Sequence, residues 1–122
     1  MFLPSNQKIY LALGITDMRK AINGLSILVE QDLLLNPFSG NLFAFCNRLN
    51  TIIKILYWDH NGFCLWTKRL EKQKFKWPRC DEDIQAISHR ELQWLLAGLD
   101  LDQPTGFSQH PQANENVTVS FS

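Results

Sequence analysis

The highest density of positive charge in this chain lies in residues 68–79, which read KRLEKQKFKWPR. Six of the twelve Lys and Arg residues of the 122-residue chain fall in this segment, against a single acid, Glu71. Leu70, Phe75 and Trp77 interrupt the charges. Cations mixed with large aromatic residues form a surface that can bind a polyanion, and nucleic acid is the first candidate.

This basic segment admits two interpretations. In the first, its cations contact the phosphate backbone while Phe75 or Trp77 stacks on an exposed base. In the second, the residues alternate as in a half-buried strand, so that both aromatic side chains belong to the core and Lys74 and Lys76 lie on the exposed face. The second is favoured, and it predicts electrostatic contacts that are indifferent to base sequence. The cations concerned are Lys68, Arg69, Lys72, Lys74, Lys76 and Arg79.

A second pair of cations, Arg19 and Lys20, falls in the first turn of a predicted helix. The helix dipole disfavours positive charge there by a few tenths of a kcal/mol, and a bound anion would reverse this penalty. Together with the Thr16 hydroxyl and the N–H groups of the helix start, these side chains could hold a phosphate or a carboxylate. The alternative, in which Asp17 and solvent satisfy both cations on an exposed face, stands equally.

Catalysis by carboxylates is the weaker hypothesis. Asp17, Asp59 and the acidic stretch 81–83 could serve as metal ligands of a nuclease if they converged. Each also has a structural explanation, because an acid suits a first helical turn, Asp59 opens a turn and the stretch 81–83 reads as a solvated loop. His60 and Cys64 follow Asp59, but a loop and a strand direct such side chains apart. Neither a P-loop nor a dinucleotide motif occurs. We predict no enzyme, no catalytic residue, no metal and no cofactor.

Composition bounds the class of protein. A chain of 122 residues with 45% hydrophobic and 20% charged residues suits one domain with one core. Its apolar runs are far shorter than the roughly 20 residues that span a bilayer, and the start MFLPSNQK lacks the pattern of a secretory signal. Three cysteines without CxxC spacing argue against a zinc site or a disulfide framework and suit a reducing compartment. We expect a cytoplasmic protein.

Charge is unevenly spread, although the formal net charge is zero. Residues 1–67 carry five bases and four acids, whereas residues 80–122 carry one base and seven acids. A basic middle and an acidic C-terminal third indicate an interaction surface without identifying its partner.

The elements that position these residues follow from periodicity. Residues 8–13 alternate like a strand. Apolar residues then recur every three or four positions, which predicts a helix over residues 17–34 with Thr16 as its N-cap. The pair Asn36-Pro37 ends this helix, because a residue before proline avoids helical angles.

Three β-rich runs follow, over residues 42–46, 52–58 and 63–70. The pair Asn61-Gly62 predicts a hairpin between the last two runs, because both residues accept positive φ. Together the runs predict an antiparallel meander, to which residues 75–77 could add a fourth strand or an extension.

A short C-terminal helix is predicted after Ser88, because Ser88 and Glu91 have the spacing of a capping box, and it ends near Gly98. Residues 103–122 are polar without periodicity and are predicted to be a disordered tail. The overall prediction is one α+β domain over residues 1–102, in which an antiparallel sheet of four or more strands packs against one main helix.

Four blocks of the sequence occur together in a known family. They are GITDMRKAINGLSILV at 14–29, NPFSGNLFAF at 36–45, IKILYWDHNGFCLWTKRLEKQKFKWP at 53–78 and LQWLLAGLD at 92–100. In this order they resemble the TnpB-type accessory protein, the second open reading frame product of insertion sequence family 66, over roughly residues 8–101. The resemblance implies a mobile-element protein that assists a separate, larger transposase in DNA transposition and has no established catalytic role.

On this resemblance we expect a non-catalytic accessory protein that binds element-end DNA, the transposase or both, without membrane contact. If it binds DNA, we expect it at the nucleoid. The rival hypothesis is a protein-interaction adaptor whose cations meet an acidic surface of the transposase or of another element-encoded protein, with no DNA contact. A metal-dependent nuclease comes third. The expected binding residues are Arg19, Lys20, Arg48, Lys54, Lys68, Arg69, Lys72, Lys74, Lys76 and Arg79.

One departure from the family pattern concerns Arg48 and Lys54. The family connection, roughly RRGDRIK, appears here as RLNTIIK at residues 48–54, which keeps only the charges of Arg48 and Lys54. If that connection helps to grip DNA in the family, this chain binds more weakly.

Overall fold

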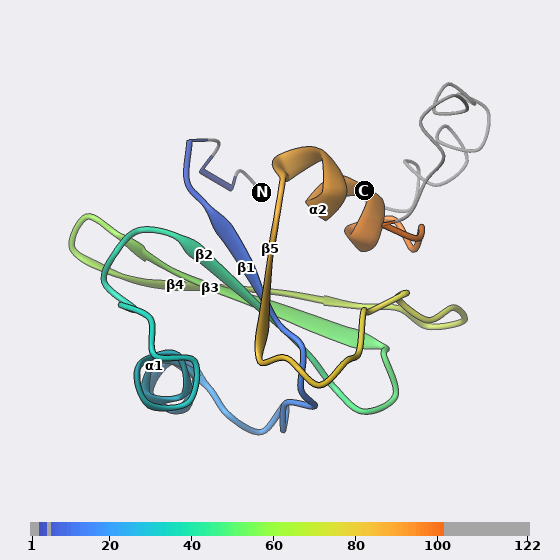
Figure 1. The fold of residues 1–122 in the computed structure, drawn as a ribbon, viewed down its shortest axis with the longest axis horizontal. Helices are drawn as coiled ribbons and strands as arrows, with labels where there is room; N and C mark the ends of the chain where they lie inside the picture. The colour runs from blue at the N-terminus through green and yellow to red at the C-terminus, as the bar shows by residue number, and fades with distance from the viewer. Residues whose placement is uncertain (1–2, 5, 102–122) are drawn as a thin grey trace.

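The structure is a computed structural model, and it describes residues 3–4 and 6–101; the predicted tail at residues 103–122 lies outside them. A five-stranded sheet has the strand order β4-β3-β2-β1-β5, and a helix lies on each face (Figure 1). The elements in chain order are β1 (Ile9–Ala12), α1 (Ile22–Gln31), β2 (Leu42–Cys46), β3 (Ile52–Asp59), β4 (Gly62–Arg69), β5 (Ile84–Ile87) and α2 (His89–Leu96). The predicted α+β class, with one main helix and a short C-terminal helix, is confirmed.

The sheet is mixed rather than wholly antiparallel. β2, β3 and β4 form the predicted antiparallel meander, and β5 also pairs antiparallel with β1. β1 and β2 are parallel, with Ile9 opposite Leu42. The reason is that the chain crosses over through α1 between these two strands, and such a crossover returns the second strand in the same direction.

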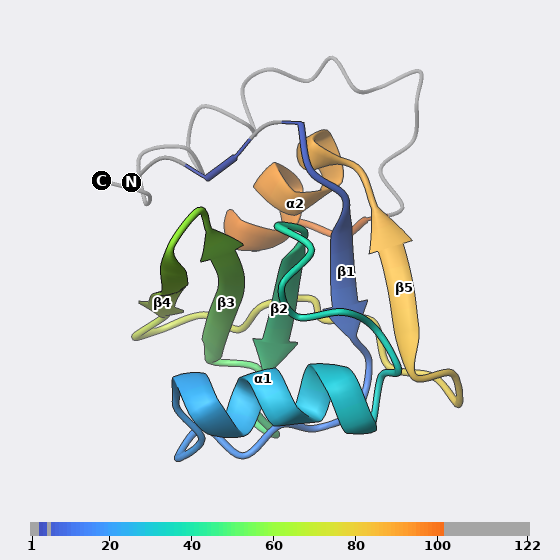
Figure 2. The ribbon, with the colours of Figure 1, turned by 90° about the vertical axis from the view of Figure 1, so that its left-hand side faces the viewer.

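Two hydrophobic layers cover the two faces of the sheet. In Figure 2, α1 lies in front of the sheet and α2 lies behind it. Alternation along β3 separates the two layers, because Ile53 and Ile55 belong to the layer beneath α2 whereas Leu56 belongs to the layer beneath α1. Leu92, Leu95 and Leu96 of α2 fill the first layer, and Leu25 and Val29 of α1 fill the second.

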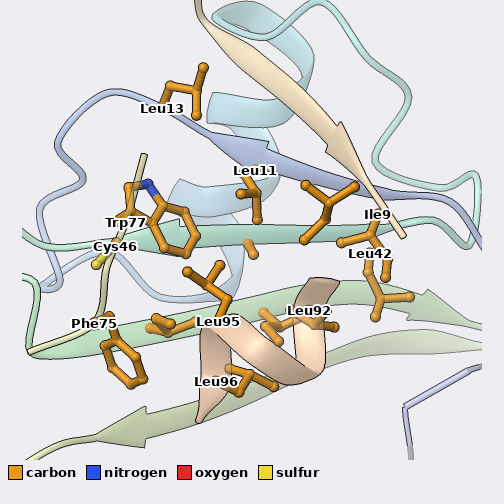
Figure 3. Packing of buried hydrophobic residues seen from close by; sticks show 14 of the residues in the cluster. Ile9, Leu11, Leu13, Leu42, Cys46, Phe75, Trp77, Leu92, Leu95 and Leu96 are labelled. Atoms are coloured by element: carbon orange, nitrogen blue, oxygen red, sulfur yellow. The ribbon is translucent and has the colours of Figure 1, made fainter. Parts of the chain in front are cut away.

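The aromatic residues of the basic segment belong to the α2 layer. Phe75 is 1% exposed and Trp77 is 5% exposed, and Figure 3 shows both side chains beside Leu95. Of the two alternatives for residues 75–77, a fourth strand or an extension, the structure has the extension. The additional strand is β5, which follows the acidic stretch 81–83 and was not predicted.

Helix α1 begins later than predicted. Its first residue is Ile22, its N-cap Ala21 makes no side-chain bond, and the expected cap Thr16 is buried with its N–H 3.0 Å from the Cys46 oxygen. The ammonium group of Lys54 binds the carbonyl oxygens of Met18 and Lys20, at 2.9 and 3.0 Å. These carbonyls therefore face β3, and the chain enters the helix only after them. Arg19 and Lys20 do not lie in a first helical turn, so their predicted placement is wrong and the helix-start geometry on which the candidate anion site depended is not found.

The hairpin between β3 and β4 is confirmed, but its loop is displaced by one residue from the predicted pair. Asp59 lies opposite Gly62, which leaves His60 and Asn61 in the loop. Positive φ falls on His60, at 61°, and not on the Asn61-Gly62 pair that the sequence favoured.

We expect His60→Gly to raise the free energy of unfolding by about 0.5–1 kcal/mol, because a residue with a Cβ atom is strained at this φ and glycine is not. Thermal unfolding followed by circular dichroism measures the change. Asn61→Gly is the matched control in the same loop, and it should not stabilise the protein because Asn61 does not have positive φ. An equal rise in both variants would contradict the explanation.

Candidate nucleic-acid interface

Three loop segments meet at one end of the sheet, where β1, β2 and β4 end and β3 begins (Figure 2). We call residues 14–20, 47–51 and 69–79 the basic end. The Thr16 N–H binds Cys46, the Leu70 N–H binds the Thr51 oxygen at 2.9 Å, and the Phe75 N–H binds the Asn50 oxygen at 2.7 Å. Cations that are far apart in the sequence are thereby brought to one side of the molecule.

Arg79 holds two of these segments together. One terminal nitrogen of its guanidinium donates to the Leu13 and Gly14 oxygens at 3.2 and 2.7 Å. The other donates to the Asn47 oxygen at 2.7 Å and to the Asn50 side-chain oxygen at 2.8 Å. The planar fork of arginine suits such a multiple contact, and a lysine could not reproduce it. Arg79 is therefore engaged within the protein, although sequence reasoning counted it among the binding cations.

Lys54 and Lys68 are also directed inward. Lys54 binds the loop before α1, as described above, and the Lys68 ammonium donates to the Leu96 oxygen at 3.1 Å, at the end of α2. A cation at a helix C-terminus is favoured by the helix dipole. Partial burial lowers the pKa of Lys68. Both lysines fasten a loop or helix end to the sheet.

Arg19 and Arg69 form ion pairs with neighbouring acids. Two guanidinium nitrogens of Arg19 donate hydrogen bonds to the Asp17 carboxylate at 2.7–3.0 Å. Arg69 donates to the Glu71 carboxylate at 3.0 Å. Hydrogen bonds from Arg19 lower the pKa of Asp17 to about 2. The side chains are largely exposed, so these pairs contribute little to stability.

The remaining predicted cations point outward. Within residues 3–4 and 6–101 they are exposed and make neither a side-chain hydrogen bond nor an ion pair; they are Lys20, Arg48, Lys72, Lys74 and Lys76. Lys74 and Lys76 alternate with the buried Phe75 and Trp77, and Lys72 precedes them. This burial supports the favoured interpretation, in which both aromatic side chains belong to the core. Stacking of Trp77 on a base is excluded in this fold, because its indole N–H binds the Ala12 oxygen at 3.0 Å inside the core.

The acids do not assemble a metal site. No group of three or more His, Cys, Asp or Glu side chains in the described part of the chain is arranged to hold a metal ion. Asp17 forms an ion pair with Arg19 at the basic end, where β3 begins. Asp59 is the last residue of β3 and therefore lies at the other end of that strand. The convergence that a two-metal nuclease needs is not present among these residues.

The cysteines differ in environment, and this gives a test of the fold. Cys46 is buried, which raises the pKa of its thiol to about 11, whereas Cys80 is exposed. A raised thiol pKa leaves little reactive thiolate at pH 8. Iodoacetamide at that pH should label Cys80 rapidly in the native protein and Cys46 only after denaturant is added, as read by peptide mass spectrometry. Equal labelling rates without denaturant would show that Cys46 is not buried.

A shallow hollow of about 620 Å³ lies between two of the loops of the basic end. Its lining includes Ile15, which is 52% exposed, and Leu49, which is 61% exposed, together with Met18 and Arg48. Sequence reasoning missed the apolar members of this hollow. Nothing in the local pattern marks them, because their proximity depends on the pairing of segments that are about thirty positions apart.

Comparison with known proteins finds one matching family model and two similar relatives. The family model described as IS66 Orf2-like protein matches residues 7–106. Two uncharacterized proteins of Sinorhizobium fredii are similar: y4hO is 41% identical over 84% of this chain and 90% of its own length, and y4jC is 37% identical over 76% and 80%. No solved structure matches the chain. Among the described residues, neither helix is long and apolar enough to cross a membrane.

Proposed function

Because the chain belongs to the IS66 Orf2-like family of transposition-associated accessory proteins, we propose that it binds DNA through the outward cations of its basic end. In this role it assists a separate transposase and performs no chemistry itself. It acts in the bacterial cytoplasm, where the element's DNA lies.

The observation that carries the proposal is that residues 72–77 combine buried aromatic side chains with exposed lysines. Phe75 and Trp77 anchor the segment in the core, and the lysines between and before them are exposed without an internal partner. An extended chain spaces alternate residues by about 7 Å, close to two phosphate rises of about 3.4 Å along one DNA strand. We call Lys72, Lys74 and Lys76 the lysine row. At this spacing Lys74 and Lys76 suit phosphates two steps apart on one strand, Lys72 in the bend before them adds a third charge, and such contacts carry no base specificity.

Arg48 and Lys20 extend this surface onto the neighbouring loops. Arg48 lies in the turn whose Asn47 and Asn50 are bound by Arg79, so its position relative to the lysine row is fixed by hydrogen bonds. Arg19 and Arg69 contribute less, because an acid already neutralises each of them. The lysine row and Arg48 are thus the main phosphate contacts in the proposal.

The purified protein should bind a labelled duplex of the element end with an affinity that falls steeply with salt. Three to five phosphate contacts predict a slope of log K against log salt of about −3 to −4.5, or a loss of roughly 40- to 500-fold between 50 and 200 mM. Fluorescence anisotropy at several salt concentrations measures this slope. A scrambled duplex of equal length should bind similarly. Absence of binding at 50 mM salt would reject DNA contact and favour the adaptor hypothesis.

A further inference from the structure

The hollow at the basic end differs in chemistry from the lysine row. Its lining combines three apolar side chains with two arginines and contains no lysine; the lining residues are Ile15, Thr16, Asp17, Met18, Arg19, Asn47, Arg48 and Leu49. The cores of protein interfaces are enriched in arginine, methionine and large apolar residues and depleted in lysine. A surface for phosphates alone would gain nothing from Ile15 and Leu49, which are 52% and 61% exposed.

Both walls of the hollow are held in place by internal bonds. Arg79 binds the Gly14 oxygen beside one wall and the Asn47 oxygen beside the other, at 2.7 Å each. Lys54 fixes Met18 from the sheet side at 2.9 Å, and Thr16 is bonded to Cys46. A partner would therefore find the hollow formed before binding, with little ordering cost.

The charge around the hollow selects the occupant. The Arg48 side chain makes neither a hydrogen bond nor an ion pair within the described residues, and Arg19 uses two of its nitrogens for Asp17 while its remaining terminal nitrogen makes no hydrogen bond there. Both can receive a carboxylate, and arginine binds carboxylates in a bidentate manner. The Asp17 carboxylate would repel any anion on its own wall, phosphate or carboxylate, and Arg19 offsets only part of that charge. An incoming carboxylate is therefore best received by Arg48, on the other wall.

We propose that this hollow is a docking site for a protein segment in which a large apolar side chain is flanked by carboxylates, and that the segment belongs to the transposase of the same element. The apolar side chain packs between Ile15 and Leu49, and a flanking carboxylate binds Arg48. The choice of transposase rests on the proposed function. The chain then has two adjacent surfaces, one for DNA and one for protein, which meet at Arg48 and share Arg79 as their common support.

Calorimetric titration of the full chain with the purified transposase of the same element, in the absence of DNA, tests this proposal. Leu49→Asp and Arg48→Glu should each weaken binding at least tenfold. Leu34→Asp is the matched control, because Leu34 is an 80% exposed leucine that does not line the hollow. It should leave the affinity unchanged. Circular dichroism of each variant checks that the fold is retained.

The outcomes separate this docking site from the proposed DNA surface. A Lys72→Gln, Lys74→Gln, Lys76→Gln variant should keep its affinity for the transposase and lose affinity for DNA. If wild-type protein does not bind the transposase, or if Leu49→Asp and Leu34→Asp weaken it equally, the docking proposal is wrong whatever the DNA result. If Leu49→Asp weakens only DNA binding, the hollow belongs to the DNA surface and the proposal is again rejected.

Discussion

Replacement of Lys72, Lys74 and Lys76 with glutamine is expected to flatten the salt dependence of DNA binding by about 2.7 units of slope. Each phosphate contact on duplex DNA contributes about 0.9 to that slope through release of counterions. The affinity lost by the variant should thus be about 40-fold larger at 50 mM salt than at 200 mM. Anisotropy titrations of both proteins on the same element-end duplex provide the comparison.

The matched control removes cations elsewhere on the protein. Lys8 and Arg90 are exposed, lie outside the basic end and make no side-chain hydrogen bond or ion pair within the described residues. A Lys8→Gln, Arg90→Gln variant should change the slope little. If its slope falls as much per charge as that of the lysine variant, binding depends on overall charge and the lysine row has no special role. An unchanged slope in the lysine variant would remove these residues from the interface.

Much of the fold could be predicted because its signals are local. Strand β2 has the predicted limits, since its short apolar run is bounded by polar turns. Helix α2 begins at the predicted capping box, in which the Ser88 hydroxyl accepts from the Glu91 N–H at 3.1 Å. The signals for both features lie in neighbouring residues, and here the tertiary contacts agree with them.

The errors occur where distant contacts override the local pattern. The apolar period of α1 extends back to Met18, but Lys54 draws the preceding loop away from the helix. Among the described strands, β5 is a short edge strand whose one neighbour is β1, and the acids before it favoured a loop. The parallel pairing of β1 and β2 likewise depends on the crossover through α1 returning β2 to a place beside β1, which no window of the sequence reveals.

The candidate site shows the same limit. Sequence alone treats every lysine and arginine as an equal source of charge. In the structure, Lys54, Lys68 and Arg79 instead hold backbone carbonyl oxygens of loops and helix ends. The acceptor of Arg79 at Gly14 is 65 positions away, so no spacing rule could identify it. The lysine row was recognisable because its alternation with aromatic residues is local.

Trp77→Ala is expected to reduce the free energy of unfolding by about 3–5 kcal/mol, the usual cost of deleting a buried large aromatic side chain. Small domains are stable by about 5–15 kcal/mol in total, so the variant should be close to unfolding at 37 °C. For a domain of this size the melting temperature falls by about 4–8 °C for each kcal/mol. Urea titration and thermal unfolding measure the loss.

Trp77→Phe distinguishes the two functions of this side chain. It retains an aromatic ring beside Leu95 but leaves the Ala12 oxygen without its donor, so it should cost about 1–3 kcal/mol and less than the alanine variant. Measured below its unfolding transition, Trp77→Phe should bind DNA with wild-type salt dependence, because the lysines and not the indole contact phosphate. A variant with unchanged stability and weakened DNA binding would instead show that Trp77 stacks on a base. Stability and affinity measured on the same protein therefore decide between the two interpretations of the basic segment.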